Sequence, residues 1–361
     1  MAKIRKQQVT LRDIADACGL SPISISYALR GDRKNVSAAT IEKVRRKADA
    51  MGYDRHLAHA ARRLRYQQDP DAVVNHLAAL FFPFYAMDDV YWGTVFRGLQ
   101  SVMFPREFGL LSCGIDALEQ DPGQRLLPIF RRGDIDGAII FATRPALGTS
   151  LVHSLRGEGG FGTRPIVVAL MDVPGCSSVV VDDYEVGHAA AAHLLGLGHK
   201  HLLTFTNPGA ESPMTKNRIA GHRAAVQDAC LPPENFVVGH WIWEDDRGLD
   251  TALADMLERY PEVTGILAPN DDGASSLYHA LHRLGYSVPR DFSVIGVDDC
   301  PPLLNLKGEN ILSTISLPIE DMGVLAGELL LEHIEDPGKV CETKVLSGEL
   351  IARSTTAPPR A

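Results

Sequence analysis

The chain has 361 residues, of which 45% are hydrophobic and 22% charged, with a net charge of −9. This balance is ordinary for a globular protein and excludes collagen-like and disordered chains, and the length suggests two or three domains. No apolar run reaches the roughly 18 residues of a membrane span, and the basic N-terminal stretch leads into no apolar segment. We therefore expect a cytoplasmic protein with neither membrane anchor nor signal peptide. The scattered cysteines lack metal-binding spacing, so we expect free thiols, no metal and no cofactor.

The charge is distributed unevenly along the chain. Residues 1–67 hold 15 Lys and Arg against 6 Asp and Glu, whereas the remainder holds 21 against 39. A basic head on an acidic body suggests that the head binds a polyanion such as DNA. The alternative is a solvated basic tail, and the pattern within the head has to decide between the two.

Three short helices are predicted in the head. The spacing of apolar residues over 11–18 predicts a first helix, which Gly19 ends. Ser21 and Pro22 have the residue types that begin a second helix, and Ser37 begins a third. A helix, a tight turn with glycine and a second helix form the helix-turn-helix arrangement, which places the N-terminal end of its second helix in the major groove.

The head residues expected to contact DNA lie mainly on and around the second helix. Its outward side chains could reach base edges, and the neighbouring basic side chains could hold phosphates. A small helical bundle without a DNA role is the alternative. The candidates are Thr10, Ser21, Pro22, Ile23, Ser24, Ser26, Tyr27, Arg30, Arg33 and Lys34.

Segments 9–15 and 19–31 resemble the opening signature of the lactose/galactose repressor (LacI/GalR) family of transcriptional regulators. Segment 285–299 resembles the most recognisable body segment of that family, and the resemblance covers nearly the whole chain. It implies a helix-turn-helix head at 1–53, a hinge helix and linker at 54–71, and an effector-binding and dimerisation domain at 72–361.

The hinge departs from the family pattern. The family usually has Pro and Asn where this chain has Arg55 and His56, and its hinge helix wedges a leucine into the minor groove. The hinge residues expected to contact DNA are His56, Leu57 and Arg62.

From residue 72 onward, short apolar runs alternate with amphipathic stretches. This alternation predicts parallel sheets covered by helices, and the length suits two doubly wound lobes. The expected strands are 75–82, 108–113, 137–141, 165–169, 178–181, 201–206, 265–268 and 293–297. The expected helices are 95–103, 186–197, 219–229, 250–259 and 273–284.

The resemblance implies a body like the periplasmic sugar-binding proteins, with a ligand cleft between two lobes. It places chain crossings near 184, 315 and 344. Lobe 1 is then expected at about 72–184 and 315–343, and lobe 2 at about 185–314 and 344–357.

Ligands of wound sheets bind outside the carboxyl ends of the strands. Carrying the family's effector contacts across residue by residue gives Tyr91, Asp172, Arg218, Trp243, Asn270 and Asp298. Carboxylate and guanidinium groups bond vicinal hydroxyls and an indole stacks on a sugar face, so the effector is expected to be a small carbohydrate. A nucleobase is the alternative, because an indole stacks on it too. Arg218 in a surface ion pair, Trp243 in the core and Asp298 in a structural turn are the alternatives.

Other chemistries find no support in the sequence. Dinucleotide, phosphate-loop, nucleophile-elbow and zinc-protease motifs are absent, so no enzyme is expected. We interpret His193 and His199 as structural rather than metal ligands. We interpret the paired aspartates at 182–183, 271–272 and 298–299 as solvated turns, because they lack calcium-loop spacing.

The sequence therefore predicts a DNA-binding transcriptional repressor controlled by a sugar-like effector. A homodimer would bind a near-palindromic operator, and segment 352–361, with two prolines and no leucine repeat, argues against a tetramer. The alternative is a solute-binding receptor without a DNA role, which the basic head disfavours. A sugar-modifying enzyme such as a kinase would need a phosphate loop.

Overall fold

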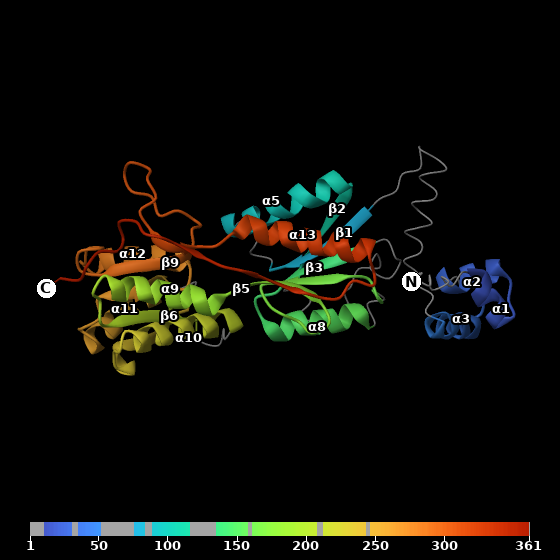
Figure 1. Cartoon of the computed structure of the whole chain (residues 1–361), viewed down its shortest axis with the longest axis horizontal. Coiled ribbons are helices and arrows are strands. Elements are labelled where there is room, and N and C mark those ends of the chain that lie inside the picture. The colour runs from blue at the N-terminus through green and yellow to red at the C-terminus, as the bar shows by residue number, and fades with distance from the viewer. Residues whose placement is uncertain are drawn as a thin grey trace, which may run out of the picture.

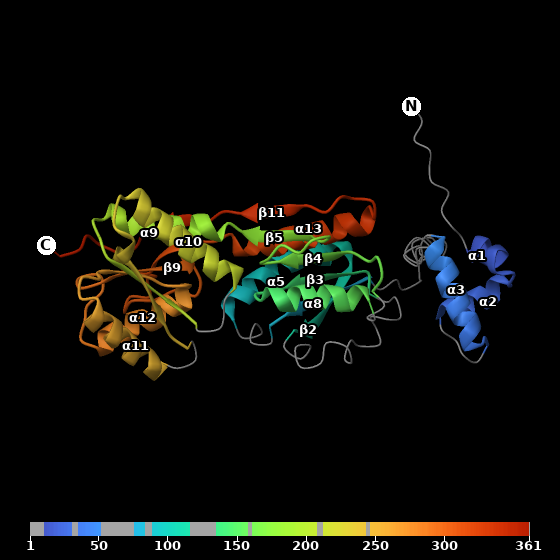
Figure 2. The same cartoon turned by 90° about the horizontal axis from the view of Figure 1, so that it is seen from below.

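The computed structural model describes residues 11–30, 35–51, 76–83, 89–115, 135–157, 161–207, 212–242 and 246–360. These residues form a helical head and an α/β body, whose two lobes lie end to end along the long axis (Figures 1 and 2). The predicted fold class is therefore the one observed. Over the described ranges, every helix is too short or too polar to cross a membrane.

The head consists of three helices, α1 (Leu11–Cys18), α2 (Pro22–Arg30) and α3 (Ala38–Ala50). Ile14, Ile25 and Val44 are fully buried and come from one helix each, so the three helices share one small core. The Ser21 hydroxyl accepts from the Ser24 N–H (3.1 Å), which caps α2 as predicted.

Lobe 1 is built on a fully parallel sheet with the strand order β11-β5-β4-β3-β1-β2. Its strands are β1 (His76–Phe82), β2 (Phe108–Gly114), β3 (Gly137–Phe141), β4 (Ile166–Ala169), β5 (Ser177–Val181) and β11 (Thr343–Leu346). Helices α5 (Val90–Met103) and α13 (Ile319–Glu335) cover one face and α8 (Pro145–Arg156) the other (Figure 1). Residues of β1 alternate between the two faces: Leu80 packs with the α5 and α13 side, whereas Phe81 packs with the α8 side.

Lobe 2 has the strand order β12-β10-β9-β8-β6-β7. Its strands are β6 (Leu202–Thr206), β7 (Phe236–His240), β8 (Gly265–Leu267), β9 (Ser293–Asp298), β10 (Ser313–Ser316) and β12 (Glu349–Ile351), of which only β12 is antiparallel to its neighbour. Helices α9 (Asp183–Gly196) and α10 (Pro213–Asp228) pack on one face, and α11 (Asp246–Arg259) and α12 (Asp271–Arg283) on the other.

The chain passes between the lobes after β5, after β10 and after β11. The first two passages lie close to the expected positions. The third lies beyond Leu346, because the parallel ladder between β11 and β5 continues through the pair Leu346 and Val181. Residues 344–346 therefore belong to the sheet of lobe 1 rather than to lobe 2.

Each body helix that the sequence predicted begins earlier in the structure than the residue at which its apolar periodicity starts. A polar side chain just ahead of the first turn accepts a backbone N–H in four of them: Asp89 for α5, Asp182 for α9, Ser212 for α10 and Asn270 for α12. Residues at the starts of these four helices line the cleft described below, so the apolar pattern of the core begins only after them.

Candidate functional site

A cleft lies between the two lobes and encloses about 1230 Å³, open solvent included. Tyr91 from lobe 1 and Arg218, Asn270 and Asp298 from lobe 2 all line it. The structure thus brings together four of the predicted effector residues, which are far apart in the sequence. The enclosed part of the cleft, about 260 Å³, has the size of a small ligand such as a monosaccharide.

The other two predicted effector residues are not among the described residues that line the cleft. Asp172 is exposed, does not line the cleft, and accepts a hydrogen bond at Oδ1 from the Thr343 hydroxyl (3.2 Å). Trp243 lies outside the described residues. The aromatic wall on the lobe 1 side is made by Tyr91 together with Trp92, whose rings meet edge to face at 5.3 Å.

Arg218 is held in a fixed position at the cleft. Its Nε donates to Asp183 Oδ1 (2.9 Å) and its Nη1 donates to the Pro269 carbonyl (2.6 Å). Both members of the ion pair are 9% exposed, so the pair is buried rather than on the surface. Burial raises the pKa of Asp183, and the guanidinium opposes that shift. Among the described residues, Nη2 has no hydrogen-bond partner, which leaves this donor for a ligand.

The ion pair depends on a close crossing of α9 and α10. A Cβ atom on Gly187 would stand 2.2 Å from the Arg218 carbonyl oxygen, and one on Gly221 would stand 2.1 Å from the Tyr184 carbonyl oxygen. Only glycine at both positions allows the two backbones to touch. Asp183, in the first turn of α9, thereby reaches Arg218 on α10.

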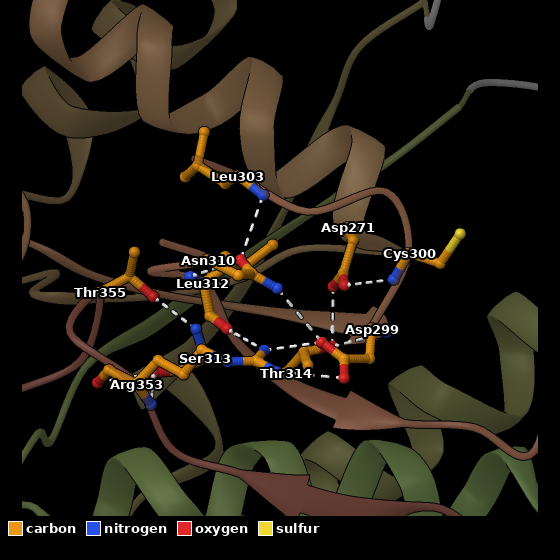
Figure 3. A network of polar contacts seen from close by, with 10 residues as sticks. All are labelled: Asp271, Asp299, Cys300, Leu303, Asn310, Leu312, Ser313, Thr314, Arg353 and Thr355. Carbon is orange, nitrogen blue, oxygen red and sulfur yellow. Dashed lines mark hydrogen bonds and ion pairs between the residues drawn. The ribbon is translucent and has the colours of Figure 1, made fainter. Parts of the chain in front are cut away.

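Asp298 enters the cleft from a strained turn at the end of β9. Its φ is 112° and that of Asp299 is 60°, both in the region that side chains disfavour. Arg353 donates to both carboxylate oxygens of Asp299 (2.6 and 3.1 Å) and to the Leu312 carbonyl (2.7 Å), as Figure 3 shows. These hydrogen bonds from Arg353 stabilise the strained backbone conformation of the turn.

Asp271 also stabilises this turn through hydrogen bonds. It is fully buried, and it accepts at Oδ1 from the Thr314 hydroxyl (2.7 Å) and at Oδ2 from the Cys300 N–H (3.0 Å; Figure 3). Burial raises its pKa to about 8, and the Thr314 hydrogen bond opposes that shift. The expectation of solvated turns is thus wrong for Asp183 and Asp271, because each carboxylate has donors inside the protein that replace water.

The cleft carries more acidic than basic groups. Asp89, Asp183, Asp272 and Asp298 line it, against the one guanidinium of Arg218. Burial raises the pKa of Asp298 to about 7, with Arg218 opposing and the carboxylates of Asp183 and Asp89 adding to the shift. This balance disfavours an anionic ligand.

In the head, α2 presents a mixed polar and apolar surface at its N-terminal end. Pro22 is exposed and Ile23 is 66% exposed, while Ser24 and Tyr27 are half-buried. The turn ahead of α2 contains Gly19 with a φ of 65°. This geometry is the helix-turn-helix arrangement that the sequence predicted.

Comparison with known proteins places both parts of the chain. A family model described as a periplasmic binding protein-like domain matches residues 191–356. The HTH-type transcriptional regulator DegA of Bacillus subtilis (strain 168) is 28% identical over 355 residues, which cover 97% of this chain and 99% of that protein. The ribose operon repressor of Escherichia coli (strain K12) is 27% identical over 341 residues, 91% of this chain and 94% of that one.

A solved structure agrees with these matches. The LacI family transcriptional regulator from Enterococcus faecium, with bound ribose, is 28% identical with a TM-score of 0.65, over 78% of this chain and 99% of that one. The chain is thus similar to HTH-type transcriptional regulators over nearly its whole length, and to a LacI family regulator over 78% of it. The resemblance recognised in the sequence is thereby confirmed.

Several of the DNA-contact candidates have no described side chain. Thr10, Arg33, Lys34, His56, Leu57 and Arg62 lie outside the described residues, and Ser26 and Arg30 are placed only as part of α2. Their contribution to DNA binding stays a prediction.

The sequence analysis also missed residues that line the cleft. Asp89 and Asp183 begin helices, and their position just before or at a first turn was the available signal. His222 follows Arg218 by four residues on α10, which places it on the same helix face.

The histidines interpreted as structural make internal contacts. His199 shares hydrogen bonds with the hydroxyls of Thr264 (2.8 Å) and Ser293 (3.0 Å), and His193 with Thr356 (3.0 Å). In the described part of the body and head, no three His, Cys, Asp or Glu side chains gather as a metal site would require.

Proposed function

We propose that this protein is a sequence-specific DNA-binding transcriptional repressor whose operator affinity is controlled by a small sugar-like effector. The observation that carries the proposal is the convergence of Tyr91, Arg218, Asn270 and Asp298 on one cleft between the lobes, in a chain that also has a helix-turn-helix head. The ribose bound by the Enterococcus faecium relative supports a carbohydrate as the effector class.

In the proposed complex, the N-terminal end of α2 enters the major groove. Ile23 makes an apolar contact with a thymine methyl, and Tyr27 reaches a base edge or a phosphate. A homodimer presents two heads to a near-palindromic operator. The apolar face of α5 at Val95 and Leu99 is buried within the chain, so we propose that the dimer uses other surface of lobe 1, including the 81% exposed Phe104 at the end of α5.

The effector we propose is neutral. The Nη2 of Arg218 donates to one hydroxyl, while the carboxyl groups of Asp298 and Asp89 accept from others. Tyr91 and Trp92 offer an apolar wall to the C–H face of a sugar ring. A phosphate or carboxylate on the ligand would meet the acidic excess of the wall.

Binding in the cleft controls the DNA affinity because the effector touches both lobes. A ligand that fits one degree of lobe closure better than another shifts the population towards it. Each head precedes lobe 1 of its own chain, so a change in closure alters how the two heads of a dimer meet the operator. We assign no catalytic activity to the protein. Its proposed location is the cytoplasm, where it would bind DNA.

The DNA arm is tested by selecting binding sites from a random duplex library and titrating the selected duplex against salt. A repressor that neutralises phosphates loses affinity with a slope of about 0.9 per phosphate contact on a logarithmic plot. We expect a steep slope together with a preference over random duplex. Binding that is absent or insensitive to salt would point to a receptor without a DNA role.

The effector arm is tested with D-ribose, D-galactose and cellobiose on the full chain bound to the selected duplex. One of these sugars is expected to change duplex affinity, and Arg218→Ala is expected to abolish the change while leaving duplex affinity without sugar nearly intact. Arg223→Ala is the matched control, because Arg223 is exposed on the same helix and does not line the cleft. A response that survives Arg218→Ala at the same sugar concentration would contradict the assigned site.

A further inference from the structure

His222 lies in the cleft wall one helical turn after Arg218. The side chain is only 4% exposed, and it lines the cleft from the α10 side. Its ring meets that of Phe236 edge to face, with the centroids 5.5 Å apart at 67°. This packing fixes the plane of the imidazole, so its nitrogens have defined directions.

The Nδ1 atom of His222 is buried and has no hydrogen-bond partner within the described ranges. Buried polar atoms are normally paired, because a lost contact with water must be replaced inside the protein. The Oγ atom of Ser178 is likewise buried without a hydrogen-bond partner, but Ser178 belongs to the sheet of lobe 1 and does not line the cleft. His222 therefore combines an unmet hydrogen bond with a place in a ligand cleft.

The imidazole is neutral at physiological pH. Burial, together with the neighbouring guanidinium groups of Arg218 and Arg223, lowers the pKa of His222 to about 3. A neutral imidazole carries one N–H and one lone pair, so it can donate to or accept from a hydroxyl group. It adds no charge that an ionic ligand would need.

We propose that His222 is a specificity-determining contact of the effector, in which the neutral ring exchanges one hydrogen bond with a single hydroxyl of a neutral sugar. This inference rests on the proposed function of the cleft. It makes the cleft selective for the presence of that hydroxyl, because a ligand without it leaves the buried nitrogen unpaired. Sites that bond a particular hydroxyl reject the deoxy analogue strongly for this reason.

The test uses two variants at this position and one control. His222→Phe keeps a ring against Phe236 but removes the hydrogen bond, and His222→Gln keeps hydrogen-bonding capacity. His153→Phe makes the same change at an exposed position on α8, away from the cleft. Each full-length protein is titrated by calorimetry with the tightest binder among D-ribose, D-galactose and cellobiose, and with the monodeoxy analogues of that sugar.

We expect His222→Phe to weaken binding of the parent sugar about tenfold or more. One deoxy analogue should bind wild type and His222→Phe equally, since the hydrogen bond is missing in both. His222→Gln should lie between the two, and His153→Phe should match wild type.

Three results would overturn the inference. Unchanged affinity of the parent sugar for His222→Phe and His222→Gln would show that no hydrogen bond is made. Equal weakening of the parent and of every deoxy analogue would show that the ring only packs or holds a water molecule. A wild-type chain that binds none of the three sugars would overturn the proposed function and this inference with it, whereas loss with Arg218→Ala but not with His222→Phe would overturn this inference alone.

Discussion

The Nε atom of Arg218 lies 2.9 Å from Oδ1 of Asp183, across the contact between α10 and α9. The contact joins the first turn of one helix to the second turn of the other at the mouth of the cleft. Buried pairs of this kind contribute little net stability, because both ions lose their hydration, but they define which way the guanidinium points. Here the pair turns one edge of Arg218 towards the ligand site.

Removing one partner of this pair should therefore cost more than removing both. Asp183→Leu leaves the guanidinium buried without its counter-ion, and we expect a loss of about 3–5 kcal/mol in the free energy of unfolding. Arg218→Met should be similarly destabilising, while the double variant should lose clearly less than the sum. Urea denaturation of the four proteins measures the coupling, and additive losses would show that the two charges do not interact.

The close crossing of α9 and α10 leads to a second prediction, about the stability of variants at its glycines. Gly187→Ala inserts a methyl group into the Arg218 backbone, so we expect a loss of about 1–3 kcal/mol and a weaker response to sugar. Gly196→Ala is the control on the same helix, because its Cβ would meet nothing within 4 Å. That change should be neutral or stabilise by up to about 1 kcal/mol. Equal thermal stability of the two variants would mean that the helices separate without cost.

Stability should fall as the pH rises from about 4 to about 7. The pKa of Asp298 is raised to about 7, whereas an unfolded aspartate titrates near about 3.9, so the folded state holds the proton over this interval. Asp298→Asn cannot titrate and should flatten the thermal stability profile over that window, and Asp172→Asn, at an exposed position, should not. A wild-type profile that rises with pH and is copied by Asp298→Asn would contradict the shift.

Arg353 should act on the effector through the turn it holds. Arg353→Met releases Asp299 and allows the strained Asp298 backbone to relax, so sugar affinity should fall and the free energy of unfolding should decrease by about 1–3 kcal/mol. Arg360→Met is the control, because the Arg360 ion pair with Asp291 lies at a more exposed site. Unchanged calorimetric affinity for Arg353→Met would show that the turn keeps its shape without this support.

Tyr27 tests the DNA-contacting face of α2. Tyr27→Ala should cost about 1–3 kcal/mol on the selected duplex if the ring or hydroxyl touches a base. Fluorescence anisotropy on selected and random duplex separates two roles, since an equal loss on both would indicate a phosphate contact. The half-buried position of Tyr27 makes a thermal melt of the head a necessary companion measurement.

The elements that sequence analysis placed well are those with local causes. The glycine turn at Gly19 and the cap at Ser21 act within a few residues, and the buried strands are continuous apolar runs such as 137–141. The edge strands β11 and β12 escaped prediction because they are short and partly exposed, so their sequences lack an apolar run.

The cleft shows the same division between local and distant causes. Asn270 and Asp298 line the cleft because both follow a predicted strand, and strand ends of a wound sheet gather at one edge. Asp183 and His222 were missed because their surroundings come from other helices and strands, through Arg218 and Phe236, which no local pattern reveals. Asp172 follows a strand too, but its carboxylate bonds Thr343 outside the cleft.

The edge strands β11 and β12 also determine when the body can be completed during synthesis. The sheet of lobe 1 can be completed only after residues 343–346 have been synthesised, and that of lobe 2 only after residues 349–351. Most of each lobe has left the ribosome before then. Both lobes therefore stay unfinished until those residues are made, with β5 exposing an open edge first and β10 exposing another once residues 313–316 have been added. A nascent chain stalled shortly before residue 343 should be held by chaperones and digested readily by protease, and translating those last strands should close both sheets almost at once.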